Sequence, residues 1–455
     1  MSLLRALPPA GTPIGSGDLA RWLRAALAPS PDRAREAAEA LEARVTERFG
    51  VRSAFLVGSG RTGLSLLVEE MARLRPGRFE VAVPGYTCYS VAAAIVRAGL
   101  RVRPLDQDPA TLDVSDAALS ALSSDPAHER VLAMVAGNLF GLPSNLPGLE
   151  RFARDRGIFL VDDAAQAMGA NVGGRAVGSF GDAGVFSLDK GKNITSLRGG
   201  ILLTSREDLA GPLERRIGAL PFPPARDRAL DVAKLTGFAL LQHPVPFSLV
   251  RRVLNLGVTV YDPEFPRLRY PERLAPLALA LLERLDDLNG ARVQRARSIR
   301  ERLRHLEGEG GLLFPASPPD AEGVALRLPL LLPDRARRDA ALEALDRAGL
   351  GASASYPRAL EDVEGVQPHL APGVARTPGS ADIAARILTL PTHAAVTDRD
   401  VDRMGTLIEL GLTAGRTVRC SVSTAPTSAA GTSSTSGTRP GSRPGSRPPP
   451  DSRRR

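Results

Sequence analysis

The sequence predicts an α/β protein whose large domain has a mostly parallel sheet covered by helices, followed by a smaller C-terminal α+β domain. Between residues 53 and 205, apolar segments of strand length alternate with segments of helical periodicity. The apolar segments are nearly continuous, which indicates strands buried on both faces. Helices between successive strands are typical of a parallel sheet with helices on both sides.

The expected elements follow one another in a regular order. Two helices are expected first, at 18–27 and 31–49, and Gly50 marks the end of the second. Strands are then expected at 53–60, 79–86, 101–106, 130–137 and 157–164, with helices at 61–74, 88–99 and 145–156. The segments 183–189 and 199–205 are expected to form a late hairpin.

The second half of the chain is less regular. Residues 210–270 form an apolar stretch that prolines and arginines interrupt, and we expect it to pack on this protein or on a second copy; contact with a membrane surface is the alternative. A long helix is expected at 274–306, then strands near 323–332 and a helix at 334–348.

These patterns suggest four regions. They are an N-terminal helical arm (1–50), a large domain (51–272, with the variable insert 210–270), a small C-terminal domain (273–412) and a disordered Ser/Pro/Arg-rich tail (413–455).

Charge and cysteine content exclude several classes of protein. The net charge of +9 comes mostly from residues 411–455, which hold eight arginines and one acid, so the nearly neutral body predicts no nucleic-acid groove. Membrane-surface contact through this basic tail is a minor alternative. Two cysteines form no disulfide framework, and no metal site is expected. No apolar run long enough to span a membrane and no secretory signal is recognised, so a cytoplasmic protein is expected.

Lysine usage singles out one short segment. Of 59 basic residues only three are lysine, namely Lys190, Lys192 and Lys234. Where any cation suffices, the chain uses arginine, so a retained lysine suggests a primary amine that can lose its proton. Two of the three lie in the run Asp189-Lys190-Gly191-Lys192.

Three motifs lie where strands of the predicted sheet end. The turn Gly58-Ser59-Gly60-Arg61 opens a helix, where free N–H groups and the helix dipole favour a phosphate. Asp162 and Asp163 end the strand 157–164, and Ser187 and Lys192 follow the strand at 183–189. A phosphate turn, a carboxylate and a lysine are what pyridoxal 5′-phosphate (PLP) requires: a phosphate cradle, a partner for the pyridine nitrogen and an amine for the imine.

Longer runs resemble the DegT/DnrJ/StrS family of PLP-dependent sugar aminotransferases. The run 161–193 is the most specific, and 82–87, 139–143 and 388–393 match further family segments. The resemblance covers 45–205 strongly and 270–410 more loosely. It implies fold type I, a homodimer with active sites at the subunit interface, and transfer of an amino group, commonly from glutamate, to a keto-sugar nucleotide. Such reactions serve polysaccharide or natural-product biosynthesis.

The resemblance also assigns roles to residues. Lys192 would be the Schiff-base lysine, and Asp163 would partner the pyridine nitrogen. Gln166 would lie against the cofactor ring, and Ser187 with the backbone of Gly60 and Arg61 would hold the phosphate.

Several positions depart from the family pattern. Arg61 stands where the family has Thr, Asn138 where it has His, and Cys88 where an aromatic residue stacks on the ring. Tyr89 and Tyr86 are the candidates to replace that aromatic. These departures motivate an alternative, a non-catalytic protein of the PLP fold that serves as a sensor or assembly partner.

An NAD(P)-dependent oxidoreductase is a third interpretation. The run Gly58-x-Gly60-x-x-Gly63 matches a dinucleotide fingerprint, but the next strand ends at Pro84-Gly85-Tyr86 without the acid that would hold the ribose.

Overall fold

A computed structural model of the chain describes residues 5–12, 14–27, 31–250 and 260–420. Residues up to Gly415 form one compact unit, to which the following description is confined. The predicted division at 272/273 stays a prediction. The helix α14 (Asp398–Cys420) continues beyond residue 413, where the tail is predicted to begin, and residues 421–455 of that tail lie outside the described residues.

The main sheet has seven strands. They are β1 (Ser53–Val57), β2 (Glu80–Pro84), β3 (Arg101–Leu105), β4 (Val131–Gly137), β5 (Phe159–Asp163), β8 (Ala183–Ser187) and β9 (Gly200–Thr204). Their order is β1-β9-β8-β5-β4-β2-β3. The pairs from β8 through β3 are parallel, whereas β9 is antiparallel to both of its neighbours, so the predicted parallel sheet and late hairpin are confirmed.

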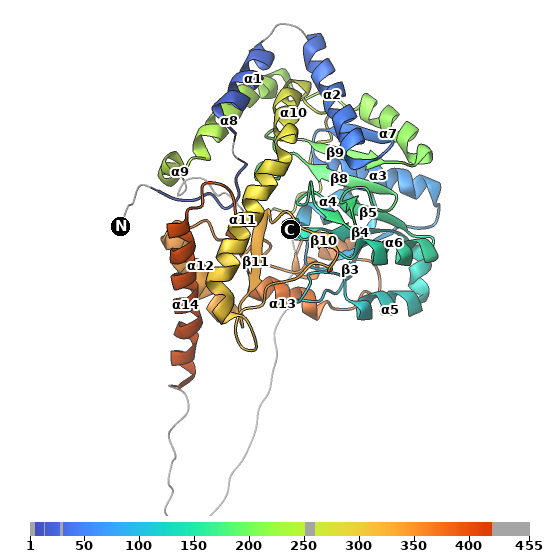
Figure 1. Cartoon of the computed structure of the whole chain (residues 1–455). Helices are drawn as coiled ribbons and strands as arrows, with labels where there is room; N and C mark the ends of the chain where they lie inside the picture. The colour runs from blue at the N-terminus through green and yellow to red at the C-terminus, as the bar shows by residue number, and fades with distance from the viewer. Residues whose placement is uncertain (1–4, 13, 28–30, 251–259, 421–455) are drawn as a thin grey trace, which may run out of the picture. The chain divides into compact units, whose positions relative to one another are not determined.

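Helices cover both faces of this sheet (Figure 1). One face packs on α2 (Pro31–Phe49), α6 (Leu146–Asp155) and α10 (Ala275–Glu283). The other packs on α3 (Gly60–Leu74), α4 (Tyr89–Arg97) and α7 (Glu207–Ala219). Successive residues of a strand face opposite ways, so both faces must be apolar, which explains the continuous apolar segments.

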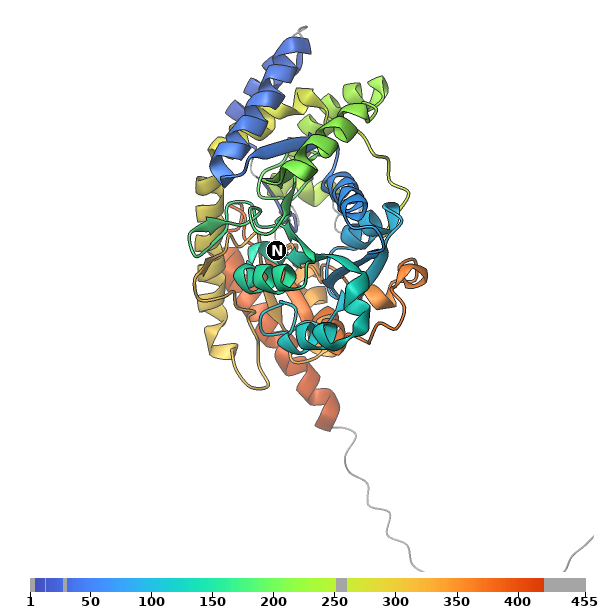
Figure 2. The same ribbon diagram turned by 90° about the vertical axis from the view of Figure 1, so that its right-hand side faces the viewer.

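The structure has further α-helices besides these six and α14. They are α1 (Ser16–Leu27), α5 (Asp116–Ser124), α8 (Ala225–Leu241), α9 (Pro244–Val250), α11 (Leu285–Leu303), α12 (Arg335–Arg347) and α13 (Pro378–Arg386). In Figure 2, as in Figure 1, the blue N-terminal helices and the light-green helices α7 and α8 lie at the same end of the molecule, and α8 packs on α1.

Two small sheets complete the fold. The strands β6 (Asn171–Val172), β7 (Arg175–Ala176) and β10 (Ala321–Glu322) form one, and β11 (Arg327–Leu331) pairs antiparallel with β12 (Ile387–Pro391) in the other. Residues from α11, α12, α14 and the β11–β12 pair share a separate apolar cluster.

The prediction of a single long helix at 274–306 is wrong, because the segment forms the two helices α10 and α11. It divides at Arg284, whose backbone leaves the helical range with φ −102° and ψ 8°. The Arg284 guanidinium contacts the Asp18 carboxylate on α1. A tertiary contact therefore accompanies the break, and no glycine or proline marks it in the sequence.

Candidate active site

A cavity of about 990 Å³ opens at the carboxyl ends of the parallel strands. It takes residues from the turns after β1, β5 and β8, the edge at which open α/β sheets bind ligands. Seven predicted site residues line it, namely Gly60, Arg61, Cys88, Asp163, Gln166, Ser187 and Lys192. The sheet topology thus brings together residues that lie up to 132 positions apart in the sequence.

The N-terminus of α3 forms an anion cradle. The Ser59 side chain caps the helix by accepting the Thr62 N–H at 3.1 Å. Among the described residues, the N–H groups of Gly60 and Arg61 find no acceptor. Free N–H groups at the positive end of a helix suit a phosphate.

Close packing explains the glycines of this cradle. A Cβ at Gly200 would lie 2.5 Å from the Gly60 nitrogen, and one at Gly58 would lie 2.6 Å from the Leu268 carbonyl oxygen. Ser187 adjoins the cradle, since a Cβ at Gly60 would lie 3.5 Å from the Ser187 Cβ. The Ser187 side chain therefore lies beside the backbone of the cradle.

The Arg61 side chain already has partners. Its guanidinium lies 3.6 Å from Asp262 and stacks over the Phe265 ring at 4.7 Å. The backbone of Arg61 can thus serve the cradle while the charge is tied to residues of the 260–270 segment.

The two aspartates after β5 have different surroundings. Asp162 is fully buried and accepts the Asn138 Nδ2–H at 2.8 Å and the N–H groups of Gly178 and Phe180. Burial raises the pKa of Asp162 to about 7, although these donors act in the opposite direction. Asp162 is therefore a structural acid that anchors the turn at 178–180.

Asp163 faces the cavity. Its Oδ1 accepts the Ala165 N–H at 3.1 Å, and burial raises the pKa of its carboxyl while that N–H and the Lys192 charge lower it. A carboxylate with a free oxygen and a nearby cation is placed to bind a protonated ring nitrogen.

Gln166 is held at both ends of its amide. Its Oε1 accepts the Phe140 N–H at 2.9 Å, and its Nε2 donates to the Tyr356 hydroxyl at 2.9 Å. Tyr356 lines the cavity and also contacts the Cys88 thiol. Burial raises the pKa of Tyr356 well above its ordinary value, so the hydroxyl stays protonated.

The expectation that Tyr89 lines the site is not supported. Tyr89 is the first residue of α4, and its hydroxyl accepts the Arg358 N–H at 3.0 Å and donates to the Arg358 carbonyl at 3.1 Å. Tyr86 is fully buried and does not line the cavity either. One step along a helix turns a side chain by roughly 100°, so Cys88 and Tyr89 face different surroundings.

Tyr356 is the aromatic residue that sequence reasoning missed. Its ring centroid lies 5.6 Å from that of Tyr86 and 5.9 Å from that of Tyr89. It comes from a loop 190 positions beyond Gln166, and no local pattern around it signals a site.

The turn that carries Lys192 is fixed from several sides. Gly191 has φ +74°, and the Lys192 carbonyl accepts the Thr12 hydroxyl. The buried Arg292 donates to the Asn193 carbonyl at 3.1 Å, and burial lowers the pKa of Arg292 to about 10. The N-terminal segment around Thr12 thus positions the turn that carries Lys192. Nothing in the sequence of that segment predicted this contact.

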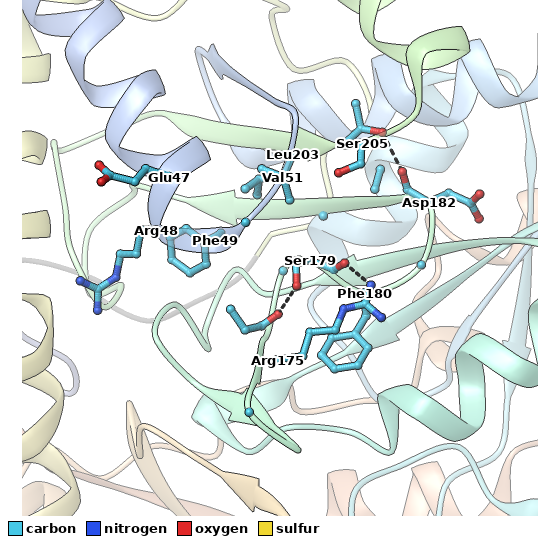
Figure 3. A pocket seen from close by; sticks show the side chains of 18 residues that line it. Glu47, Arg48, Phe49, Val51, Arg175, Ser179, Phe180, Asp182, Leu203 and Ser205 are labelled. Atoms are coloured by element: carbon cyan, nitrogen blue, oxygen red, sulfur yellow. Dashed lines mark hydrogen bonds between the residues drawn. The ribbon is translucent and has the colours of Figure 1, made fainter.

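A second cavity of about 530 Å³ lies at the opposite edge, where β8 begins and β9 ends (Figure 3). Its cations are already engaged. Arg175 contacts Glu150 and stacks on Phe180 at 4.2 Å, and Arg48 pairs with Asp286. It contains none of the predicted site residues.

The sheet order argues against a dinucleotide fold. In that fold the Gly-rich turn follows a central strand whose neighbour carries the ribose-binding acid. Here β1 lies at the edge of the sheet, and β9, β8, β5 and β4 separate it from β2.

Comparison with known proteins is consistent with this geometry. The sequence profile of the DegT/DnrJ/EryC1/StrS aminotransferase family matches residues 32–215 and 267–409, leaving 216–266 unmatched. The chain is 27% identical over 372 residues to a UDP-N-acetyl-3-dehydro-α-D-glucosamine 3-aminotransferase of Acidithiobacillus ferrooxidans, covering 81% of this chain and 87% of that protein.

Two further matches extend the comparison. An L-glutamine:2-deoxy-scyllo-inosose aminotransferase of Streptomyces fradiae is 36% identical over 167 residues, covering 36% of this chain and 38% of that protein. The crystal structure of DesI with its TDP-sugar product superposes with a TM-score of 0.70 at 24% identity, covering 92% of this chain and 95% of that one.

Proposed function

This chain belongs to the DegT/DnrJ/EryC1/StrS aminotransferase family, and we propose that it transfers an amino group to a keto-sugar nucleotide with PLP held on Lys192. The observation that carries the proposal is the convergence of the α3 cradle, Asp163, Ser187 and Lys192 on one cavity. That convergence also weighs against the non-catalytic alternative, because each group that the chemistry needs is retained.

The residues present fit the cofactor. The unengaged N–H groups of Gly60 and Arg61, together with the Ser187 hydroxyl, would hold its phosphate. Asp163 would hold the proton on its ring nitrogen, and Gln166 would lie against the ring, fixed by Phe140 and Tyr356. PLP, when bound, supplies an aldehyde for the amine and a ring that withdraws electrons.

Lys192 has two tasks in this proposal. Its amine would hold the cofactor between turnovers, and when free it would move a proton at the substrate carbon that bears nitrogen. The contacts of Thr12 and Arg292 with the Lys192 turn fix the backbone from which that amine reaches. A rigid backbone holds a proton-transferring group close to the orientation that the reaction requires.

The substrate class rests on the relatives. The Acidithiobacillus protein is named for a UDP-linked keto sugar, and the DesI structure contains a TDP-sugar product. For this chain we propose a keto-sugar nucleotide as acceptor and glutamate as donor, in polysaccharide or natural-product biosynthesis.

A half-reaction tests the proposal. PLP-loaded protein mixed with glutamate should release 2-oxoglutarate in an amount equal to the protein, because each site turns over once without an acceptor. The cofactor absorbance should change when glutamate is added and should return to its starting spectrum when a UDP-linked 3-keto sugar is added. No 2-oxoglutarate from wild-type protein, or equal release from Lys192→Ala, would refute the assignment.

We also propose a cytoplasmic homodimer. The helices α8 and α9 expose apolar side chains, with Leu240 61% and Leu249 70% exposed, in the segment expected to pack on this protein or on a second copy. None of the described helices is both long and apolar enough to cross a bilayer. Light scattering during gel filtration should give twice the mass of the chain, 48.1 kDa, and a monomer would contradict the dimer.

A further inference from the structure

All three lysines of the chain line the same cavity. Only three of its 59 basic residues are lysine, yet Lys190, Lys192 and Lys234 all lie along the walls of the candidate active site. Ion pairs elsewhere in the described residues are made by arginine or histidine. The lysines of this chain therefore lie where a ligand bound in the cavity could contact them.

Lys234 comes from outside the family's common core. It lies on α8, within residues 216–266 that the family profile leaves unmatched, and its side chain is exposed to the cavity. In the described part of the chain no carboxylate lies within ion-pair distance of its amine. Lys234 is thus a feature of this segment, and its ammonium is free to meet a ligand in the cavity.

Two acids that line the same cavity are already paired. Asp231 contacts Arg198, and Asp262 lies 3.6 Å from Arg61. The Nε of Arg198 is buried without a hydrogen-bond partner among the described residues and lies on the same wall. A negatively charged ligand group in the cavity would give the Lys234 ammonium a partner, whereas a neutral group would leave it unpaired.

We propose that Lys234 binds an anionic oxygen group of the substrate, either a phosphate of the nucleotide or a carboxylate of the amino donor. The inference rests on the proposed function and assigns Lys234 to substrate specificity, with no part in holding the cofactor. A lysine suits this role because its compact, mobile ammonium can follow a flexible ligand, whereas the fork of arginine requires a fixed geometry.

Binding of two probe ligands tests the proposal. UDP and glutarate are titrated by calorimetry into PLP-loaded wild-type protein, Lys234→Gln and Arg226→Gln. Arg226 is the matched control, since it lies on the same helix, is 84% exposed, pairs with Asp227 and does not line the cavity. Glutamine keeps the helical propensity of the site, so α8 is retained.

The expected result is a loss of about tenfold or more in affinity for one ligand in Lys234→Gln, with less than a twofold change in Arg226→Gln. Loss for UDP identifies the nucleotide phosphate, and loss for glutarate identifies the donor carboxylate. Equal loss in both variants, no loss in either, or no binding of either ligand to wild-type protein would overturn the proposal.

The cofactor absorbance, recorded before titration, separates this test from the proposed function. Lys234→Gln should show the wild-type spectrum, because Lys234 has no assigned contact with the cofactor. If wild-type protein takes up no PLP, the proposed function fails, while UDP titration of that protein still decides whether Lys234 binds an anion.

Discussion

Replacing Asn138 with alanine should destabilise the protein and loosen its cofactor site. Asn138 is buried and links the ends of β4 and β5 to the segment before α6. Its Nδ2 donates to Asp162 at 2.8 Å and to the Asp163 carbonyl at 3.0 Å, and its Oδ1 accepts the Ser144 N–H at 3.0 Å. The substitution leaves the Ser144 N–H and one oxygen of Asp162 without these partners.

The size of the effect follows from those contacts. A buried polar group that loses its partner costs roughly 1–3 kcal/mol, so two such groups predict a loss of about 3 kcal/mol in the free energy of unfolding. The matched control is Asn145→Ala, where an exposed asparagine caps α6 by accepting the Gly148 N–H at 3.1 Å. Loss of such a cap costs about 1 kcal/mol.

Urea unfolding followed by circular dichroism measures both variants, and a PLP titration followed by absorbance measures the site. Asn138→Ala should lower the unfolding free energy more than Asn145→Ala does and should weaken PLP binding, because Asp163 loses a backbone support. Equal losses of unfolding free energy in the two variants, or unchanged PLP affinity in Asn138→Ala, would refute the role assigned to the Asn138 hydrogen bonds.

Four further substitutions test other positions. Tyr356→Phe removes the hydroxyl that binds Gln166, and a PLP titration should show affinity reduced by about tenfold, from about 1–2 kcal/mol for the unpaired amide; unchanged affinity would contradict the role of this contact. Burial lowers the pKa of His393 to about 4, so the unfolded state takes up a proton first as pH falls from about 6.5 to 4, and folded stability is lost across that window. Between pH 7 and pH 4.5 the free energy of unfolding, measured with urea, should therefore fall by about 2 kcal/mol less in His393→Gln than in wild-type protein. An equal fall in both proteins would exclude His393 as the cause. Gly184→Ala places a Cβ 1.8 Å from the Gly178 carbonyl oxygen and should cost about 3 kcal/mol or more, whereas Gly218→Ala, with nothing within 4 Å on helix α7, should gain up to about 1 kcal/mol in the same assay.

The sheet and its helices were predictable because their signals are local. Strands such as β4 and β5 are buried on both faces and read as continuous apolar runs, and glycines such as Gly50 mark where helices end. The order of the strands brings the ends of β1, β5 and β8 together, which is why motifs after these strands meet at one cavity.

The features that sequence reasoning missed depend on contacts between distant segments. Tyr356 reaches Gln166 from another part of the chain, and Thr12 supports the Lys192 turn from the N-terminal segment. The break at Arg284 accompanies its contact with Asp18. Tyr89 was placed in the site on proximity to Cys88 in sequence, but the helix turns it toward Arg358. A local pattern contains none of this information.

The most direct test of the central claim is to trap the cofactor covalently. Protein loaded with PLP is reduced with borohydride, digested and mapped by mass spectrometry, alongside Lys192→Ala and the neighbouring control Lys190→Ala. We predict the pyridoxyl label on the peptide at Lys192 in wild-type protein and in Lys190→Ala, and no label at this site in Lys192→Ala. Absence of label from wild-type protein, or label on Lys190 or Lys234 in place of Lys192, would contradict the account.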